Sequence, residues 1–254
     1  MKPLTVLLSL FVLASCATEN AEKAIDGKVY TLAFHDEFNG KSLDADKWVY
    51  RTDSKHWSTQ EPGNVEIKDG KLLLHLKKEQ SKGMEYSGAG IISKARYSYG
   101  YYEASMKVPP GAGWHNSFWL MNHDGSGSTA TESAIMEIDI IENDSKDPEK
   151  YGVNFHKWKD NHVSIGHKVV DSPDMSKDFQ VFSCVFAPEY VKFFLNEEEV
   201  HMIDISDMPK ASQNIWLTSI ASWLGNTEAV DESQLPATLE FDYVRYYQPE
   251  LTAN

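Results

Sequence analysis

The chain has 254 residues, of which 41% are hydrophobic and 24% charged, a composition typical of globular proteins rather than disordered or fibrous ones. Its formal net charge is −14, from 24 basic and 38 acidic side chains, and the pI is about 5.0. This charge argues against a nucleic-acid partner, because phosphate binding requires a basic surface. The aromatic residues (7 Trp, 12 Tyr and 11 Phe) fit either a β-sheet core or stacking against sugar rings.

The N-terminus has the pattern of a targeting segment. Lys2 precedes an apolar run from Leu4 to Leu13, which is too short to span a bilayer and has the length of a signal-peptide core. The run leads into Ala14-Ser15-Cys16, which resembles a bacterial lipobox, in which the cysteine is lipidated. We therefore expect a lipoprotein signal peptide over residues 1–15, then a lipidated Cys16 and a polar tether over residues 16–29. The protein is then an exported outer-membrane or cell-surface lipoprotein of a bacterium, and an ordinary cleaved signal peptide with an incidental cysteine is the alternative.

Short alternating or apolar runs follow one another along the rest of the chain. They cover residues 65–67, 72–76, 97–108, 117–121, 135–141, 181–186, 190–195 and 239–247. Asp69-Gly70 and Asn196-Glu197 predict hairpin turns, and a Gly/Ser/Thr-rich stretch at 124–131 predicts a mobile loop. Cys184 lies in a strand-like run and is expected to be a buried, unreactive thiol. Because no linker divides residues 30–249, we expect one all-β domain, a β-sandwich or jelly roll.

The run that begins at Ile135 carries three acidic residues. Because side chains alternate along a strand, Glu137 and Asp139 share one face and the intervening isoleucines the other. Glu142 joins the acidic face only if one extra residue at Ile140-Ile141 forms a β-bulge. A solvated acidic face or a calcium site are the structural alternatives, although a solvated face does not explain the strict alternation with apolar residues. A retaining glycosidase needs two carboxylates about 5–5.5 Å apart, and crowding of like charges raises the pKa of at least one of them.

The segment Glu137-Ile138-Asp139-Ile140-Ile141-Glu142 resembles the E-x-D-x-x-E motif of glycoside hydrolase family 16 in its bulged form. The resemblance extends over residues 30–249, through similar segments at 34–40, 64–72, 99–104, 118–120 and 241–247. It implies a concanavalin A-like jelly roll, a curved β-sandwich with a substrate cleft on its concave face. It also assigns Glu137 as the nucleophile, Glu142 as the acid/base and Asp139 as the helper between them.

The resemblance suggests four residues that bind the substrate. His156, on the expected next strand, corresponds to a histidine near the leaving group, although a histidine bonded into the sheet is the alternative. Trp119 is expected on the cleft floor, and Trp114 and Trp223 are candidate platforms for sugar rings. Core packing is the alternative for each tryptophan.

The resemblance implies no cofactor for catalysis, but a structural calcium on the convex side is common in the family. The matching positions are Glu37, Gly70 (through its carbonyl) and Asp242, and oxygen ligands of this kind suit calcium. Such an ion stabilises the fold and takes no part in the reaction. The expected partner is a polysaccharide bound by a monomer whose only membrane contact is the lipid anchor.

These features predict a secreted endo-β-glycosidase that cuts internal polysaccharide linkages by double displacement. Members that cut β-1,3-glucan usually carry a Trp-Pro pair before Phe118-Trp119 and an Arg after Ser87-Gly88, and neither is present here. The Ser-Phe-Trp pattern is closer to members that cut agar-like or carrageenan-like galactans. The substrate is therefore either a β-galactan (agar, porphyran or carrageenan type) or a β-1,3/1,4-glucan. A transglycosylase and a non-catalytic carbohydrate-binding protein are the competing functions.

Overall fold

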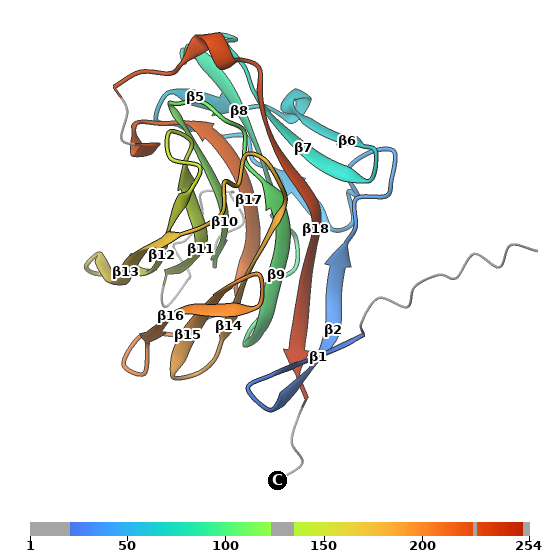
Figure 1. The fold of residues 1–254 in the computed structure, drawn as a ribbon, viewed down its shortest axis with the longest axis vertical. Helices are drawn as coiled ribbons and strands as arrows, with labels where there is room; N and C mark the ends of the chain where they lie inside the picture. The colour runs from blue at the N-terminus through green and yellow to red at the C-terminus, as the bar shows by residue number, and fades with distance from the viewer. Residues whose placement is uncertain (1–20, 123–134, 226–227, 251–254) are drawn as a thin grey trace, which may run out of the picture.

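The computed structural model describes residues 21–122, 135–225 and 228–250, which form strands with three short 3-10 turns (Figure 1). The strands of the first sheet are β1 (Glu22–Ile25), β2 (Lys28–Asp36), β6 (Val65–Lys68), β7 (Lys71–Leu76), β9 (Gly100–Lys107), β14 (Gln180–Phe186), β15 (Tyr190–Leu195), β16 (Glu198–Asp204) and β18 (Ala237–Pro249). Those of the second sheet are β3 (Trp48–Tyr50), β4 (Ser54–Lys55), β5 (Ser58–Gln60), β8 (Tyr86–Ser93), β10 (Trp114–Met121), β11 (Met136–Asp144), β12 (Lys150–Lys157), β13 (Val163–Asp171) and β17 (Asn214–Ala221). The 3-10 turns are η1 (Pro62–Asn64), η2 (Trp223–Gly225) and η3 (Glu232–Gln234).

The strands are arranged in two layers (Figure 1). One nine-stranded sheet has the order β1-β2-β18-β9-β14-β15-β16, and β7 joins it beside β18 and carries β6. The other has the order β13-β12-β11-β10-β17-β8-β5-β4, and β3 pairs with β8. Hairpins of consecutive strands alternate with pairs that are far apart in sequence, such as β18 with β2 and with β9, as in a jelly roll. The strands pair antiparallel except β5 with β8.

The hydrophobic core lies between the two sheets and follows the alternation of each strand. On β7, Leu72, Leu74 and Leu76 are completely buried while the residues between them are half-buried. Such alternation removes one face of each strand from water, which is the main driving force for stacking the sheets. Cys184 on β14 lies in this core, and burial raises the pKa of its thiol, so the expectation of a buried cysteine is confirmed.

Two-residue turns join neighbouring strands at both predicted places. Asp69-Gly70 joins β6 to β7 and Asn196-Glu197 joins β15 to β16, and all four residues have the positive φ that such tight turns require. Both predictions are confirmed.

A third turn of the same kind corrects the expected start of the folded domain. Asp26-Gly27 also has positive φ and joins β1 to β2, so residues 22–29 pair into the first sheet. Lys23 on β1 forms an ion pair with Glu103, a side chain completely buried on β9. The expectation of a tether is therefore wrong for residues 22–29, because this Asp-Gly pair is a hairpin signal like the one at residues 69–70. Cys16, residues 1–15 and the loop expected at 124–131 lie outside the described residues.

Among the described residues, no helix is long and apolar enough to cross a membrane.

Candidate active site

Strand β11 contains the predicted β-bulge. Against β12, β11 advances three residues from Asp139 to Glu142 while β12 advances two. Against β10, Ile140 is the extra residue, because Asp139 and Ile141 face consecutive residues there. The bulge brings Glu142 onto the face that already carries Glu137, and the isoleucines pack into the core. The predicted register is confirmed.

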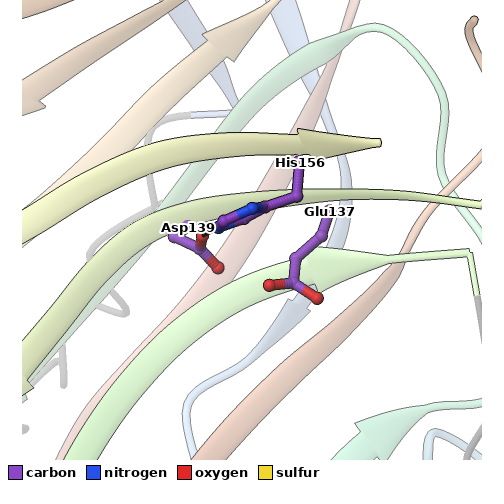
Figure 2. Close-up of side chains that lie close together, drawn as sticks. All are labelled: Glu137, Asp139 and His156. Carbon is purple, nitrogen blue, oxygen red and sulfur yellow. Dashed lines mark ion pairs between the residues drawn. The ribbon is translucent and has the colours of Figure 1, made fainter. Parts of the chain in front are cut away.

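Figure 2 shows Glu137 and Asp139 on β11 beside His156 on β12. His156 lies directly opposite Glu137, and its Nε2 is 3.2 Å from Oδ2 of Asp139. Each of the three residues offers one possible ligand atom, and these atoms lie within 4.8 Å of one another. The three side chains are therefore close enough together to hold a cation. Asp139 is only 2% exposed, and its Oδ2 accepts no hydrogen bond from the described residues. A solvated acidic face is therefore excluded.

The surroundings of these two carboxyls favour their neutral forms. Burial raises the pKa of Glu137 well above its usual range, and the charge of Asp139 raises it further. Burial also raises the pKa of Asp139, and the charge of Glu142 adds to this effect. The pair therefore holds one negative charge far more easily than two.

An indole nitrogen supports the negative charge on Glu137. Trp158, just after β12, donates its Nε1–H to Oε2 of Glu137 over 3.0 Å, which lowers the pKa of that carboxyl. The Trp158 ring stacks on His162 with 4.0 Å between ring centroids, and Nε2 of His162 lies 2.9 Å from Nδ1 of His156. Trp158 was missed by the sequence analysis, although Asn154, His156 and Trp158 alternate along one face of the chain.

Glu142 is bound to a histidine that the sequence analysis also missed. Nε2 of His115, on β10, lies 3.1 Å from Oε1 of Glu142, and its Nδ1 lies 3.3 Å from Oδ1 of Asp144. His115 is 6% exposed, and although burial disfavours its charged form, the hydrogen bonds to Asp144 and Glu142 raise its pKa to about 9. Burial alone would raise the pKa of Glu142, but the hydrogen bond and charge of His115 hold it below its usual value. Alternation along β10 places His115 on the same face as Trp119, a signal that could have identified it.

The structure separates the three candidate tryptophans. Trp119 lies opposite Asp139 on β10, is partly exposed, and packs on Trp216 with 4.6 Å between ring centroids. Trp223 in η2 is 54% exposed and contacts the ring of His56. Both can present an aromatic surface to a sugar ring.

Trp114 cannot serve as a platform in this structure. Its side chain is completely buried, in a cluster with Leu76, Tyr86 and Ala221. Trp114 is one residue from His115, so it faces the opposite side of β10. The expectation that it binds sugar is wrong.

One of the residues expected to hold calcium, Glu37, is already paired with a cationic side chain. The turn at Gly70 does lie next to the loop after β2, since a Cβ on Gly70 would be 3.2 Å from Oδ1 of Asn39. However, both carboxylate oxygens of Glu37 accept hydrogen bonds from Arg245, over 2.9 and 2.8 Å. The guanidinium already neutralises this carboxylate, and Asp242 is exposed to solvent. We find no support for calcium at Glu37, Gly70 and Asp242.

A cavity of about 520 Å³ opens beside Glu142, lined by His115, Asp144, His167 and Leu224 among others. The cleft face holds the half-buried Glu137 with the buried Asp139 at one end, and the Glu142–His115 pair at the other. The first pair can supply a nucleophile, and the second can give and take a proton across the same bound group.

Comparison with known proteins places this arrangement in context. The family model described as "Beta-porphyranase A-D, GH16 domain" matches residues 29–249. A β-glucanase of Rhodothermus marinus is 26% identical over 266 residues, which cover 94% of this chain and 92% of the relative. A β-porphyranase E of Zobellia galactanivorans is 33% identical over 118 residues, 43% of this chain and 40% of the relative.

Solved structures share the fold. The LamAcat structure from Zobellia galactanivorans superimposes with a TM-score of 0.76 at 25% identity, covering 86% of this chain and 98% of that one. An endo-β-1,3-glucanase from Pyrococcus furiosus has a TM-score of 0.78 at 22% identity, covering 91% and 99%. These likenesses confirm the predicted curved jelly roll.

Proposed function

The chain belongs to glycoside hydrolase family 16, and we propose that it is a retaining endo-β-glycanase that cuts a β-linked polysaccharide inside the chain. The observation that carries this proposal is the bulged strand β11, which turns Glu137, Asp139 and Glu142 to one face. A non-catalytic binding protein has no need to bury crowded acids, because their repulsion and desolvation cost stability. The arrangement therefore favours catalysis over binding alone.

The proposed reaction has two displacements. The Glu137 carboxylate attacks the anomeric carbon while Glu142 delivers a proton to the departing oxygen, and water then cleaves the glycosyl-enzyme with Glu142 as the base. Asp139 holds the proton that would otherwise neutralise the nucleophile. A transglycosylase uses the same residues and differs only in passing the glycosyl group to a sugar. The reaction needs no cofactor, and the Glu37–Arg245 pair gives no reason to add calcium.

A β-galactan of the agar or porphyran type is the substrate that we propose first. The matching family model is that of β-porphyranases, and a β-porphyranase is among the curated relatives. A β-1,3/1,4-glucan is the second candidate, supported by the β-glucanase that matches along almost its whole length. The partly exposed Trp119 and the exposed Trp223 suit either, because a pyranose ring of any sugar can stack on them.

A reducing-end assay of the full chain tests both the proposed glycanase activity and the proposed substrate class. The panel is laminarin, mixed-linkage glucan, agarose, porphyran and κ-carrageenan, with the Glu137→Gln variant as the control. We expect new reducing ends from one polymer class, accompanied by a rapid fall in viscosity, and no signal from the variant. Oligosaccharide binding without turnover in the wild-type chain would contradict the proposal and favour a binding protein.

We also propose that the protein is exported and held at a membrane by lipid on Cys16, as a monomer. The proposal is supported by the apolar run from Leu4 to Leu13 and by the lipobox-like residues that follow it. In cell fractionation, the wild-type chain should stay with the membranes, and a Cys16→Ala variant should be lost from them. Equal distribution of the two would contradict the anchor.

A further inference from the structure

His115, Glu142 and Asp144 form a chain of hydrogen bonds that ends at the proposed acid/base. The imidazole bridges the two carboxylates, with its Nε2 on Glu142 and its Nδ1 on Asp144. Since β10 and β11 are neighbours, the bridge is built on paired strands, and His115 lies directly opposite Asp144. His115 itself is only 6% exposed and faces the apolar Ile220 on β17, whereas the two carboxylates of the bridge reach the cavity beside Glu142.

The proton balance of this bridge differs from that of an isolated carboxylic acid. A general acid must hold a proton at the working pH, but His115 lowers the pKa of Glu142 and thereby favours its ionised form. The proton that Glu142 lacks is present on the imidazole, whose own pKa is raised to about 9. Asp144 accepts the Nδ1–H, and this hydrogen bond stabilises the imidazolium and orients its other N–H towards Glu142.

We propose that His115 is a proton-relay residue that supplies the acid/base Glu142 and is itself positioned by Asp144. This inference rests on the proposed function. In the first displacement the bond between the anomeric carbon and the leaving oxygen breaks and its electron pair goes to that oxygen. The proton on Nε2 of His115 passes to Glu142 and from Glu142 to the leaving oxygen, which leaves His115 neutral. In the second displacement the attacking water gives its proton to Glu142, which returns it to Nε2.

Other titratable groups face the bridge and belong to its electrostatics. They are Glu137 and Asp139 on β11, His56 after β4, Lys146 and Asp147 after β11, Lys150 and His156 on β12 and His167 on β13. His167 approaches Glu142 across Gly152, where a Cβ would be 3.5 Å from Nε2 of His167 and 3.9 Å from Cβ of Glu142. In the described part of the chain, none of these groups is hydrogen-bonded to His115, so the bridge is the direct route for a proton to Glu142.

The pH dependence of kcat/KM tests the relay. The wild-type chain should stay active until the bridge loses its proton, so the alkaline limb should lie near pH 9. In His115→Gln the amide still donates a hydrogen bond to Glu142 but holds no transferable proton. The alkaline limb of the profile should therefore move to lower pH by at least about one pH unit. Activity at pH 8 should then drop by about 10-fold or more, with a much smaller loss at pH 5.

Two further variants distinguish proton transfer through His115 from a purely structural role of its hydrogen bonds. Asp144→Asn, at a side chain that is 41% exposed, removes the charge that stabilises the imidazolium and should move the limb in the same direction. His75→Gln alters a histidine on β7 that bonds Thr238 and Glu66 in the other sheet, and should keep the wild-type profile.

An aryl glycoside with a dinitrophenolate leaving group needs no proton, so its cleavage should be nearly unaffected by His115→Gln.

Three results would overturn the relay. One is a pH profile of His115→Gln that is merely scaled down at every pH, and another is an equal loss on the dinitrophenyl substrate. The third is an NMR titration of the full chain in which the His115 imidazole loses its proton near its ordinary pKa. The NMR result does not depend on turnover, so it also separates failure of the relay from failure of the proposed function, in which the wild-type chain cleaves none of the substrates.

Discussion

A Glu137→Gln variant should retain its fold and lose at least about 10³-fold in kcat on the polysaccharide that the wild-type chain cleaves. The amide has nearly the same shape as the carboxylate and can still accept the hydrogen bond from Trp158. It cannot form the glycosyl ester, because a neutral amide is a poor nucleophile. Steady-state kinetics with a measured dissociation constant for an oligosaccharide would separate the expected loss of turnover from any loss of binding.

The same substitution should leave the melting temperature unchanged or higher. The pKa of Glu137 is raised in the folded chain by burial and by the charge of Asp139, so the folded state favours the neutral form of this side chain. Above that raised pKa the charged form costs stability, and glutamine removes the cost. Glu198→Gln on the exposed end of β16 is the matched control and should change neither kcat nor the melting temperature. Turnover near the wild-type value in Glu137→Gln would exclude it as the nucleophile, and a large fall in melting temperature would mean that its charge supports the fold.

The carboxylate strand was predictable because it depends on one local rule. Alternation gave the shared face of Glu137 and Asp139, and the need to return Glu142 to that face located the bulge at Ile140-Ile141. The same rule applied to β10 would have turned Trp114 into the core and His115 towards the cleft. That error came from treating an aromatic residue as a platform without assigning its strand face.

What could not be predicted depends on contacts between distant segments. The protonation of Glu142 is set by His115, which is 27 positions away and reaches it only because β10 and β11 pair in this register. Likewise, Glu37 was a plausible calcium ligand until its partner Arg245, 208 positions away, was seen to hold both its oxygens. A sequence lists the ionisable groups, but their charge depends on burial and on neighbours that only the fold brings together.

Glu142→Ala should lower kcat on the polysaccharide by about 10²–10⁴-fold, because the sugar leaving group then departs without a proton. A dinitrophenyl glycoside should still form the glycosyl-enzyme, and water should attack it slowly in the absence of a base. Azide should restore turnover on this substrate, since the small anion fits the space that the carboxylate leaves and needs no base. The product should be a glycosyl azide with the configuration of the substrate.

Glu142→Gln is the matched control for this rescue. Its amide fills the same space and keeps an acceptor for His115, so it should be as slow on the polysaccharide but respond weakly to azide. The alanine variant should also melt lower than the glutamine variant at neutral pH, because it leaves the Nε2–H of a buried His115 without its acceptor. A glycosyl azide of inverted configuration would refute the double displacement. Equal rescue of both variants would show that azide does not enter at Glu142, and the acid/base would then have to be sought elsewhere on the cleft face.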